Sequence, residues 1–197
     1  EDGTIVVGIY SIDIDGNNCP YILRSEDSGQ TWRLHDLCAR NTAVAGNETA
    51  LCEISPGKLT ALTRSDLGRD DHYLLQMWSD DGGRSWTEPI KTQIWGHPAH
   101  LLKLKDGRIL CTHGYRRSPI GVRAVVSEDG SETWKVSDSI VIRDDSSGHS
   151  PHRGEGTGLG DVGYPVSMQL PDGDVLTAYY VTPSDNVTHC AATRWQP

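Results

Sequence analysis

Hydrophobic and polar residues alternate along the chain in short runs that predict strands rather than helices. One unit shows this most clearly, with apolar runs at 100–104, 108–115 and 122–127, and a fourth run at 133–142 that is expected to be a strand beginning at its tryptophan. β-Branched residues lie within the runs, whereas Gly, Asp, Ser and Pro lie between them. The connections are short enough for hairpins, so the unit is predicted to be a four-stranded antiparallel meander.

A short acidic motif before the last strand of this unit occurs three times in the chain. It reads SEDSGQTW at 25–32, SDDGGRSW at 79–86 and SEDGSETW at 127–134, and we call each copy an Asp box. The copies begin 54 and 48 residues apart, a spacing typical of propeller blades. Ser and Asp side chains can bond nearby backbone amides, and Gly adopts conformations that other residues resist, so each box is predicted to close a hairpin turn.

The third residue of each box is an aspartate for which we expect a structural role. A metal site would need several oxygen ligands that converge from one loop, whereas Asp27, Asp81 and Asp129 are dispersed along the chain. The tryptophan that ends each box is expected to pack between neighbouring sheets.

Glycine turns form a second marker in phase with the boxes. Gly3, Gly57 and Gly107 lie 22, 22 and 20 residues before the next box, and each is followed by an apolar, β-prone run, as is Gly173. The fold class is therefore predicted to be all-β, a β-propeller of four-stranded antiparallel blades. About four blades are expected, with roughly three, four, four and three strands, as one portion of a ring over residues 1–197 that further blades or a second chain would complete.

Composition narrows the range of partners. The 197 residues carry a net charge of −9, which disfavours nucleic acid and anionic membranes because clustered Lys and Arg bind these surfaces. The net charge does not exclude a small anionic ligand, since a few arginines can make one pocket of an acidic protein positive. No apolar run is long enough to cross a membrane. The five cysteines form no C-x-x-C pair, so no zinc site is predicted, and we expect neither metal nor cofactor.

The Asp boxes, together with GNETALCEISPGKLTALTRSD at 46–66 and DVGYPVSMQLPDGDVLTAYY at 161–180, resemble bacterial exo-sialidases with bacterial neuraminidase repeats. The resemblance covers essentially the whole chain. It implies a six-bladed propeller, a glycan substrate ending in sialic acid or a related acidic sugar, and a secreted or periplasmic location. Relative to that family, the chain is expected to lack the N-terminal blades that carry one arginine and the acid/base aspartate, and so to be a poor enzyme alone.

The resemblance also implies which residues form the site. Tyr164 matches the nucleophile, Glu48 matches its base, and Arg64 matches an arginine of the triad that binds the substrate carboxylate. A second triad arginine is Arg116 or Arg117, with Arg116 preferred because it comes first after its strand.

These residue types suit a substrate that carries a carboxylate on its anomeric carbon. Arginines can hold that carboxylate with two parallel hydrogen bonds. A carboxylate nucleophile would be repelled by the substrate, whereas a neutral tyrosine is not. Phenol has a pKa of about 10, so it needs a neighbouring base before it attacks at neutral pH.

Two other interpretations remain open at this stage. The chain could be a non-catalytic glycan-binding propeller that keeps the arginines, or a structural repeat module for protein partners. The glycosidase and glycan-binding interpretations both require Arg64, Arg116 and Tyr164 to lie close together, whereas the interpretation as a structural module does not. Glu48 and Arg64 could also form an ordinary ion pair at the rim. Pro165 stands where sialidases usually carry serine, which leaves the choice of sugar open.

Overall fold

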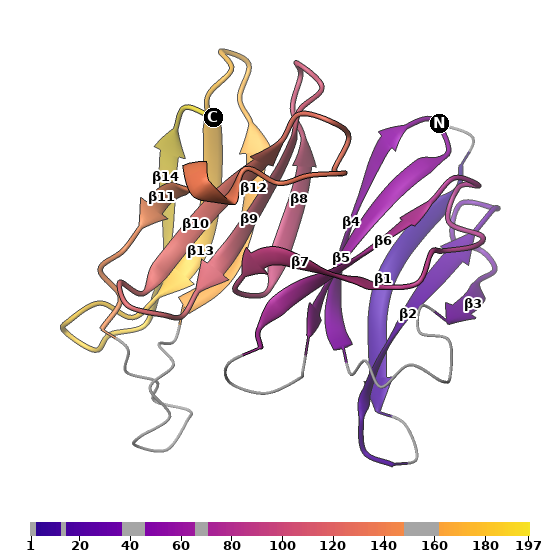
Figure 1. Cartoon of the computed structure of the whole chain (residues 1–197), viewed down its shortest axis with the longest axis horizontal. Helices are drawn as coiled ribbons and strands as arrows, with labels where there is room; N and C mark the ends of the chain where they lie inside the picture. The colour runs from indigo at the N-terminus through magenta and orange to yellow at the C-terminus, as the bar shows by residue number, and fades with distance from the viewer. Residues whose placement is uncertain (1–2, 13–14, 37–45, 66–70, 148–161) are drawn as a thin grey trace. The chain divides into compact units, whose positions relative to one another are not determined.

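Strands make up nearly all of the regular structure. The computed structural model describes residues 3–12, 15–36, 46–65, 71–147 and 162–197. In these residues, 14 strands and one 3-10 helix form four antiparallel sheets (Figure 1). The chain divides into two compact units, Glu1–Trp95 and Gly96–Pro197, each of which contains two sheets.

In the first unit, each strand pairs with the next one along the chain. The first sheet consists of β1 (Ile5–Ile12), β2 (Asn18–Ser25) and β3 (Arg33–Asp36). The second sheet consists of β4 (Gly46–Ser55), β5 (Lys58–Ser65), β6 (Tyr73–Ser79) and β7 (Ile90–Trp95).

The second unit repeats this plan. Its first sheet has the spatial order β11-β10-β9-β8, formed by β8 (Ala99–Lys103), β9 (Ile109–Tyr115), β10 (Gly121–Ser127) and β11 (Ile140–Arg143). Its second sheet consists of β12 (Val162–Gln169), β13 (Val175–Val181) and β14 (His189–Trp195). The predicted antiparallel meander is confirmed, and so are the strand numbers of three, four, four and three among the described residues.

The prediction for the last strand of the unit at 100–142 was wrong in one respect. The strand begins at Ile140, not at Trp134, because residues Val136–Asp138 form a 3-10 turn. The backbone N–H groups of Asp138 and Ser139 donate to carbonyls of Lys135 and Val136 at 3.2 and 3.3 Å. Amides engaged in these local bonds cannot join the sheet, so the ladder starts later.

The hydrogen bonds of the Asp boxes confirm the predicted turn lock. In the second box, the Ser79 hydroxyl accepts from the Gly83 amide at 2.9 Å and donates to Asp81 Oδ1 at 2.8 Å. Asp81 also accepts from the amide and hydroxyl of Ser85, at 2.9 and 2.6 Å. The same Ser–Asp pairs close the other boxes, with Ser25 bonded to Asp27 and Ser127 bonded to Asp129 at 2.8 Å.

Two consecutive residues in every box have a positive φ. The pairs are Ser28–Gly29, Gly82–Gly83 and Gly130–Ser131, with φ between 57° and 88°. The third box therefore keeps the backbone of the others although its glycine stands one place earlier, because glycine fills either of the two left-handed positions.

The tryptophans of the boxes differ in burial. Trp86 packs in the core of the first unit against Ile22, Ala61 and Met77, which confirms the expectation that it lies between neighbouring sheets. Trp32 does not, because its side chain is 42% exposed on a face of the first sheet that also exposes Leu34.

The core of the second unit contains both apolar and polar contacts. Leu104, Leu110, Ala124 and Val175 form one apolar cluster, against which Trp195 packs. Beside it, a line of buried hydroxyls joins the two sheets: Thr112 bonds Ser167 at 3.1 Å and Ser167 bonds Thr177 at 2.8 Å. Each of these polar groups is satisfied by its neighbours, so burial carries little penalty.

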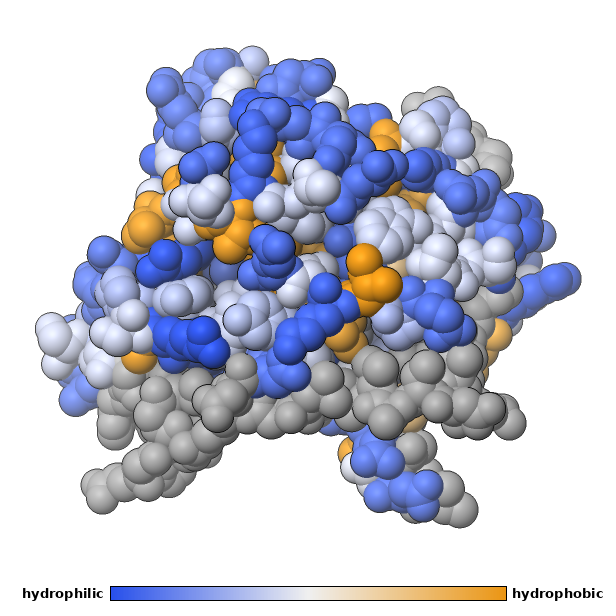
Figure 2. Space-filling view, viewed as in Figure 1, coloured by the Kyte–Doolittle hydropathy of each residue, from blue (hydrophilic) through white to orange (hydrophobic). Residues whose placement is uncertain are grey.

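Polar residues predominate on one face of the molecule (Figure 2). On the face shown in Figure 2, hydrophilic residues cover most of the described surface and hydrophobic residues occur in small groups. Within the part of the chain that the structure describes, no helix is both long enough and apolar enough to cross a membrane. The described residues also contain no group of three or more His, Cys, Asp and Glu side chains that could hold a metal ion.

Candidate active site

Glu48 lies on a β-bulge near the start of β4. Gly46 pairs with Ser65 and Thr49 pairs with Thr63, so two residues of β4, Asn47 and Glu48, stand opposite the single residue Arg64 of β5. Such a bulge re-aims side chains where a strand begins.

The bulge brings Glu48 and Arg64 together. Nη1 of Arg64 donates to Oε2 of Glu48 at 2.9 Å, with the arginine side chain 13% exposed and the glutamate side chain 23% exposed. Nε of Arg64 is buried, and none of the described residues accepts a hydrogen bond from it. A buried guanidinium donor without an acceptor is costly, so this edge of Arg64 is suited to an acceptor supplied by a ligand.

Tyr164 lies on a second bulge, near the start of β12. Gly163 pairs with Tyr180 and Val166 pairs with Ala178, so Tyr164 and Pro165 stand together opposite one residue of β13. Tyr164 has a φ of 50°, a conformation that few residues other than glycine adopt. Its side chain is 50% exposed, and its ring stacks on that of Tyr180 with the centroids 6.0 Å apart.

Arg116 lies next to the backbone that leads into Tyr164. The arginine is buried, and its Nε donates to the carbonyl oxygen of Val162 at 3.1 Å. A Cβ atom added to Gly163 would lie 3.5 Å from Nη2 of Arg116, so the guanidinium lies against this glycine. Arg117 is exposed in the connection between β9 and β10. Of the two candidate arginines, Arg116 is therefore the one placed beside Tyr164.

A third bulge of the same kind opens the sheet of β8. The amide of His97 donates to the carbonyl of Gly114 at 2.9 Å, and the amide of Gly114 donates to the carbonyl of Pro98 at 3.4 Å, so two residues again face one. A Cβ atom on Gly96 would lie 2.3 Å from the carbonyl oxygen of Gly114, which explains why glycine begins the bulge.

Comparison of the three bulges shows a repeat that sequence reasoning missed. Each has glycine followed by two residues that share one partner: Gly46-Asn47-Glu48, Gly96-His97-Pro98 and Gly163-Tyr164-Pro165. The recurrence of G-x-E or G-x-P before an apolar run was the signal available in the sequence. Tyr180, the stacking partner of Tyr164, had no signal of its own.

The structure thus assembles two pairs from the predicted residues, one within each unit. Glu48 is bonded to Arg64 in the first unit, and Arg116 lies beside the Tyr164 segment in the second. Each pair combines a guanidinium group with a group capable of proton transfer or nucleophilic attack.

Comparison with known proteins identifies the family. The family model for BNR repeat-like domains matches residues 1–177. The chain belongs to the BNR repeat-like domain family. A comparison with curated protein sequences finds no match.

Several solved structures are similar to this BNR repeat-like chain. A protein of unknown function from Dyadobacter fermentans is 29% identical, with a TM-score of 0.81, over 100% of this chain and 51% of that one. A mutant of NanB sialidase from Streptococcus pneumoniae is 17% identical, with a TM-score of 0.66, over 98% of this chain and 29% of that one. A xylan beta-1,4-xylosidase from Bacillus halodurans is 12% identical, with a TM-score of 0.65, over 100% of this chain and 38% of that one.

These similarities place the BNR repeat-like chain in a fold that glycoside hydrolases with different substrates share. The chain spans about half the length of the Dyadobacter protein and less of the two hydrolases. A sialidase and a xylosidase match with nearly equal TM-scores, so the fold is glycosidase-like without selecting a sugar.

Proposed function

We propose that this chain is the portion of a six-bladed propeller glycosidase of the exo-sialidase type that carries the nucleophile, its base and two carboxylate-binding arginines. The substrate is a glycan that ends in sialic acid or a related acidic sugar. The observation that carries the proposal is the buried Nε of Arg64. Glu48 accepts from Nη1 of this arginine, and none of the described residues accepts from its Nε.

Arg64 supports binding of a carboxylate. Its Nη1 is held by Glu48, which fixes the plane of the guanidinium, and its Nε edge requires an acceptor. A substrate carboxylate would satisfy that edge with charge-assisted hydrogen bonds. Arg116, anchored through its Nε to Val162, would add a second guanidinium to the same carboxylate.

Tyr164 supports attack on the sugar. Its exposed ring and left-handed backbone present the hydroxyl at the start of β12. In the proposed step, the phenol oxygen forms a bond to the anomeric carbon, the phenolic proton passes to the carboxylate of Glu48, and the bond to the leaving oxygen breaks as that oxygen takes a proton from an acid that other blades of the propeller would supply. Water then attacks the anomeric carbon from the face of the leaving group and gives up a proton to the same acid, the bond to the tyrosine oxygen breaks, and Glu48 returns its proton to the phenol, so the configuration is retained. The proposal requires Glu48 to reach the Tyr164 hydroxyl.

The combination of tyrosine with arginines favours an acidic sugar over a neutral one. Most glycosidases use two carboxylates, one of which attacks the anomeric carbon or activates water. A nucleophile without charge is an advantage when the substrate carries its own carboxylate at that carbon. Tyr164 with Arg64 and Arg116 fits this case better than it fits cleavage of a neutral pentose.

The test is covalent labelling with a 2,3-difluorinated sialic acid. Fluoride leaves without protonation, so labelling does not depend on a general acid. We expect a mass increase of one sugar on the peptide that contains Tyr164, no label in Tyr164→Phe, and full labelling in the control Tyr73→Phe.

Glu48→Gln tests the base in the same assay. We expect labelling to slow by about 10²-fold or more, the range typical of general bases. Binding of N-acetylneuraminic acid should stay within about threefold of the unaltered chain. Absence of label on Tyr164, or reversible binding without any label, would reject the hydrolase and leave a glycan-binding protein. An unchanged rate in Glu48→Gln would remove Glu48 from the mechanism.

A further inference from the structure

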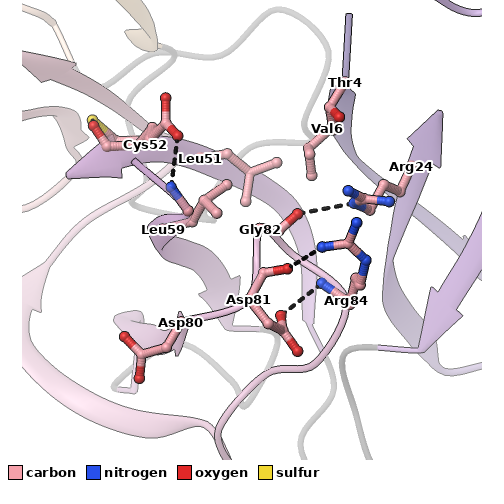
Figure 3. A pocket seen from close by; sticks show the side chains of 12 residues that line it. Thr4, Val6, Arg24, Leu51, Cys52, Leu59, Asp80, Asp81, Gly82 and Arg84 are labelled. Atoms are coloured by element: carbon pink, nitrogen blue, oxygen red, sulfur yellow. Dashed lines mark hydrogen bonds between the residues drawn. The ribbon is translucent and has the colours of Figure 1, made fainter. Parts of the chain in front are cut away.

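A cavity of about 500 Å³ lies in the first unit, away from the bulge that holds Glu48. Its walls come from β1 and β2, from the part of β4 that leads into the β4–β5 turn, and from the second Asp box (Figure 3). This volume is within the range of small-molecule sites. The residues that line it include Leu51 and Glu53 of β4, whereas Glu48 is absent from the lining.

One wall of the cavity carries two guanidinium groups on either side of Gly82. Nε of Arg24 donates to the carbonyl of Gly82 at 2.9 Å, and Nη1 of Arg84 donates to the carbonyl of Asp81 at 2.8 Å. A Cβ atom on Gly82 would lie 3.6 Å from Nη1 of Arg84 and 3.9 Å from Nη2 of Arg24. Figure 3 shows the two groups side by side at this edge of the cavity.

The two cations share one carboxylate outside the cavity lining. Nη1 of Arg24 and Nη2 of Arg84 both donate to Oε1 of Glu26, the latter at 2.8 Å. The side chain of Arg24 is only 5% exposed, so its charge is poorly screened by water. Each guanidinium group has five N–H donors, and these bonds use two of them in Arg24 and two in Arg84, so donors remain for a further acceptor at this wall.

The other walls are apolar and then acidic. Val6, Leu51 and Leu59 supply aliphatic surface, and Figure 3 shows Leu51 and Val6 facing the space beside Gly82. Glu53 also lines the cavity, and its side chain accepts from the Gly57 amide at 3.0 Å. Asp80 and Asp81 also line the cavity, and the carboxylate of Asp81 is bonded to the hydroxyls of Ser79 and Ser85. These carboxylates can accept from hydroxyl groups and repel a second negative charge.

We propose that this cavity is a second binding site, which takes a small molecule with one carboxylate, several hydroxyls and a carbon face, namely an acidic monosaccharide. Its carboxylate binds Arg24 and Arg84, its C–H face rests on Leu51 and Val6, and its hydroxyls lie toward Glu53. We infer a single carboxylate on the ligand from the pair of Arg24 and Arg84. The choice of a sugar rests on the proposed function.

The test is an NMR titration of the whole chain with sodium D-glucuronate and with N-acetylneuraminic acid. We expect the backbone amides of Gly82, Gly57 and Leu51 to shift with one common dissociation constant, and lactose, which lacks a carboxylate, to bind at least fivefold more weakly. Arg84→Gln should weaken binding about tenfold, because it removes one guanidinium group. The matched control is Lys135→Gln, which removes a cation paired with Glu128 at the third Asp box.

Several outcomes would overturn the second site. These are no shift at Gly82 and Gly57, equal binding of lactose, or unchanged affinity in Arg84→Gln. If Arg84→Gln does not fold, the amide shifts in the unaltered chain and the comparison with lactose still show whether the cavity binds a carboxylate. Tyr164→Phe separates the two proposals, because it abolishes labelling and leaves the shifts at Gly82 and Gly57 intact. Shifts without labelling of Tyr164 would leave a carboxylate-binding cavity and reject the hydrolase.

Discussion

At the scale of single residues, bulges and burial decide which side chains can act. Glu48 and Arg64 meet because two residues of β4 face one residue of β5. Tyr164 is exposed at a left-handed position, and an aromatic neighbour stacks on it. The amino acids alone do not distinguish these residues from ordinary strand residues, since their geometry arises from pairing with the neighbouring strand.

Tyr180 is predicted to hold the ring of Tyr164 in place. The rings stack at 25° with centroids 6.0 Å apart, an arrangement that limits rotation of the exposed Tyr164 side chain. In Tyr180→Phe, which keeps the ring, we expect the difluorinated sialic acid to label Tyr164 at the normal rate. In Tyr180→Leu we expect labelling of Tyr164 to be about tenfold slower. Thermal unfolding measures any general loss of stability. Equal labelling rates in both variants would show that the stacking does not position Tyr164.

His113 is predicted to make the stability of the fold depend on pH between 6.5 and about 4. Burial lowers the pKa of His113 from 6.5 to about 4, so the unfolded chain binds a proton more readily than the folded one. Stability is therefore full above pH 6.5 and falls by about 3 kcal/mol as the pH drops to 4. Urea unfolding at pH 7, 6, 5 and 4 measures the slope, and His113→Gln should reduce it. A slope unaffected by this substitution would contradict the assignment.

At the scale of elements, the Asp boxes act as turn locks whose strength depends on ionised aspartate. Each box combines a serine, an aspartate and two left-handed residues, and the three copies make the same bonds from slightly different sequences. The strand that follows each box is less uniform, because after the third box a 3-10 turn delays its start to Ile140.

The contribution of the Asp boxes to the free energy of unfolding is predicted to be lost at low pH. Hydrogen bonds from Thr31 lower the pKa of Asp27 from 3.8 to about 2, and those from Ser85 lower the pKa of Asp81. Their contribution to stability is present above pH 3.8 and is lost as the pH falls toward 2. Unfolding free energies between pH 5 and 2 test this. Asp81→Asn should lower stability at pH 5 and flatten the curve below pH 4, whereas an unchanged curve would contradict the lock.

At the scale of the whole molecule, the chain exposes an apolar sheet face that soluble proteins usually cover. Ile5 and Val7 of β1 are 38 and 39% exposed, Leu34 of β3 is 60% exposed, and Trp32, which directly precedes β3, is 42% exposed. Exposed apolar area of this kind favours association with another surface. The repeat supports this interpretation, because Trp86 occupies the same box position as Trp32 and is packed between two sheets.

The exposed face is predicted to cause self-association. We expect sedimentation velocity to show oligomers that increase with protein concentration, and Leu34→Lys to shift the chain toward the monomer. Val187→Lys is the control, since Val187 is equally exposed, at 59%, outside the sheets. A monomer at all concentrations, or an equal effect of both substitutions, would contradict the prediction.

The amino-acid sequence alone predicts the all-β class, the three Asp boxes, the antiparallel meanders and the three, four, four and three strands. These features depend on local patterns, namely apolar periodicity, turn chemistry and a repeat, which act within one or two hairpins. The net charge of −9 disfavours binding of nucleic acid, and the cysteine spacing offers no C-x-x-C pair for zinc.

Tertiary contacts decide which of the candidate residues lie together. The pairing of Glu48 with Arg64, the choice of Arg116 over Arg117 beside Tyr164, and the stacking of Tyr180 all depend on strand register and bulges. The cavity of Arg24 and Arg84 is lined by four segments that lie far apart in the sequence, at residues 4–6, 24, 51–59 and 80–84. Such contacts depend on side chains distant in sequence, so the packing of sheets, and not the pattern of any one strand, determines them.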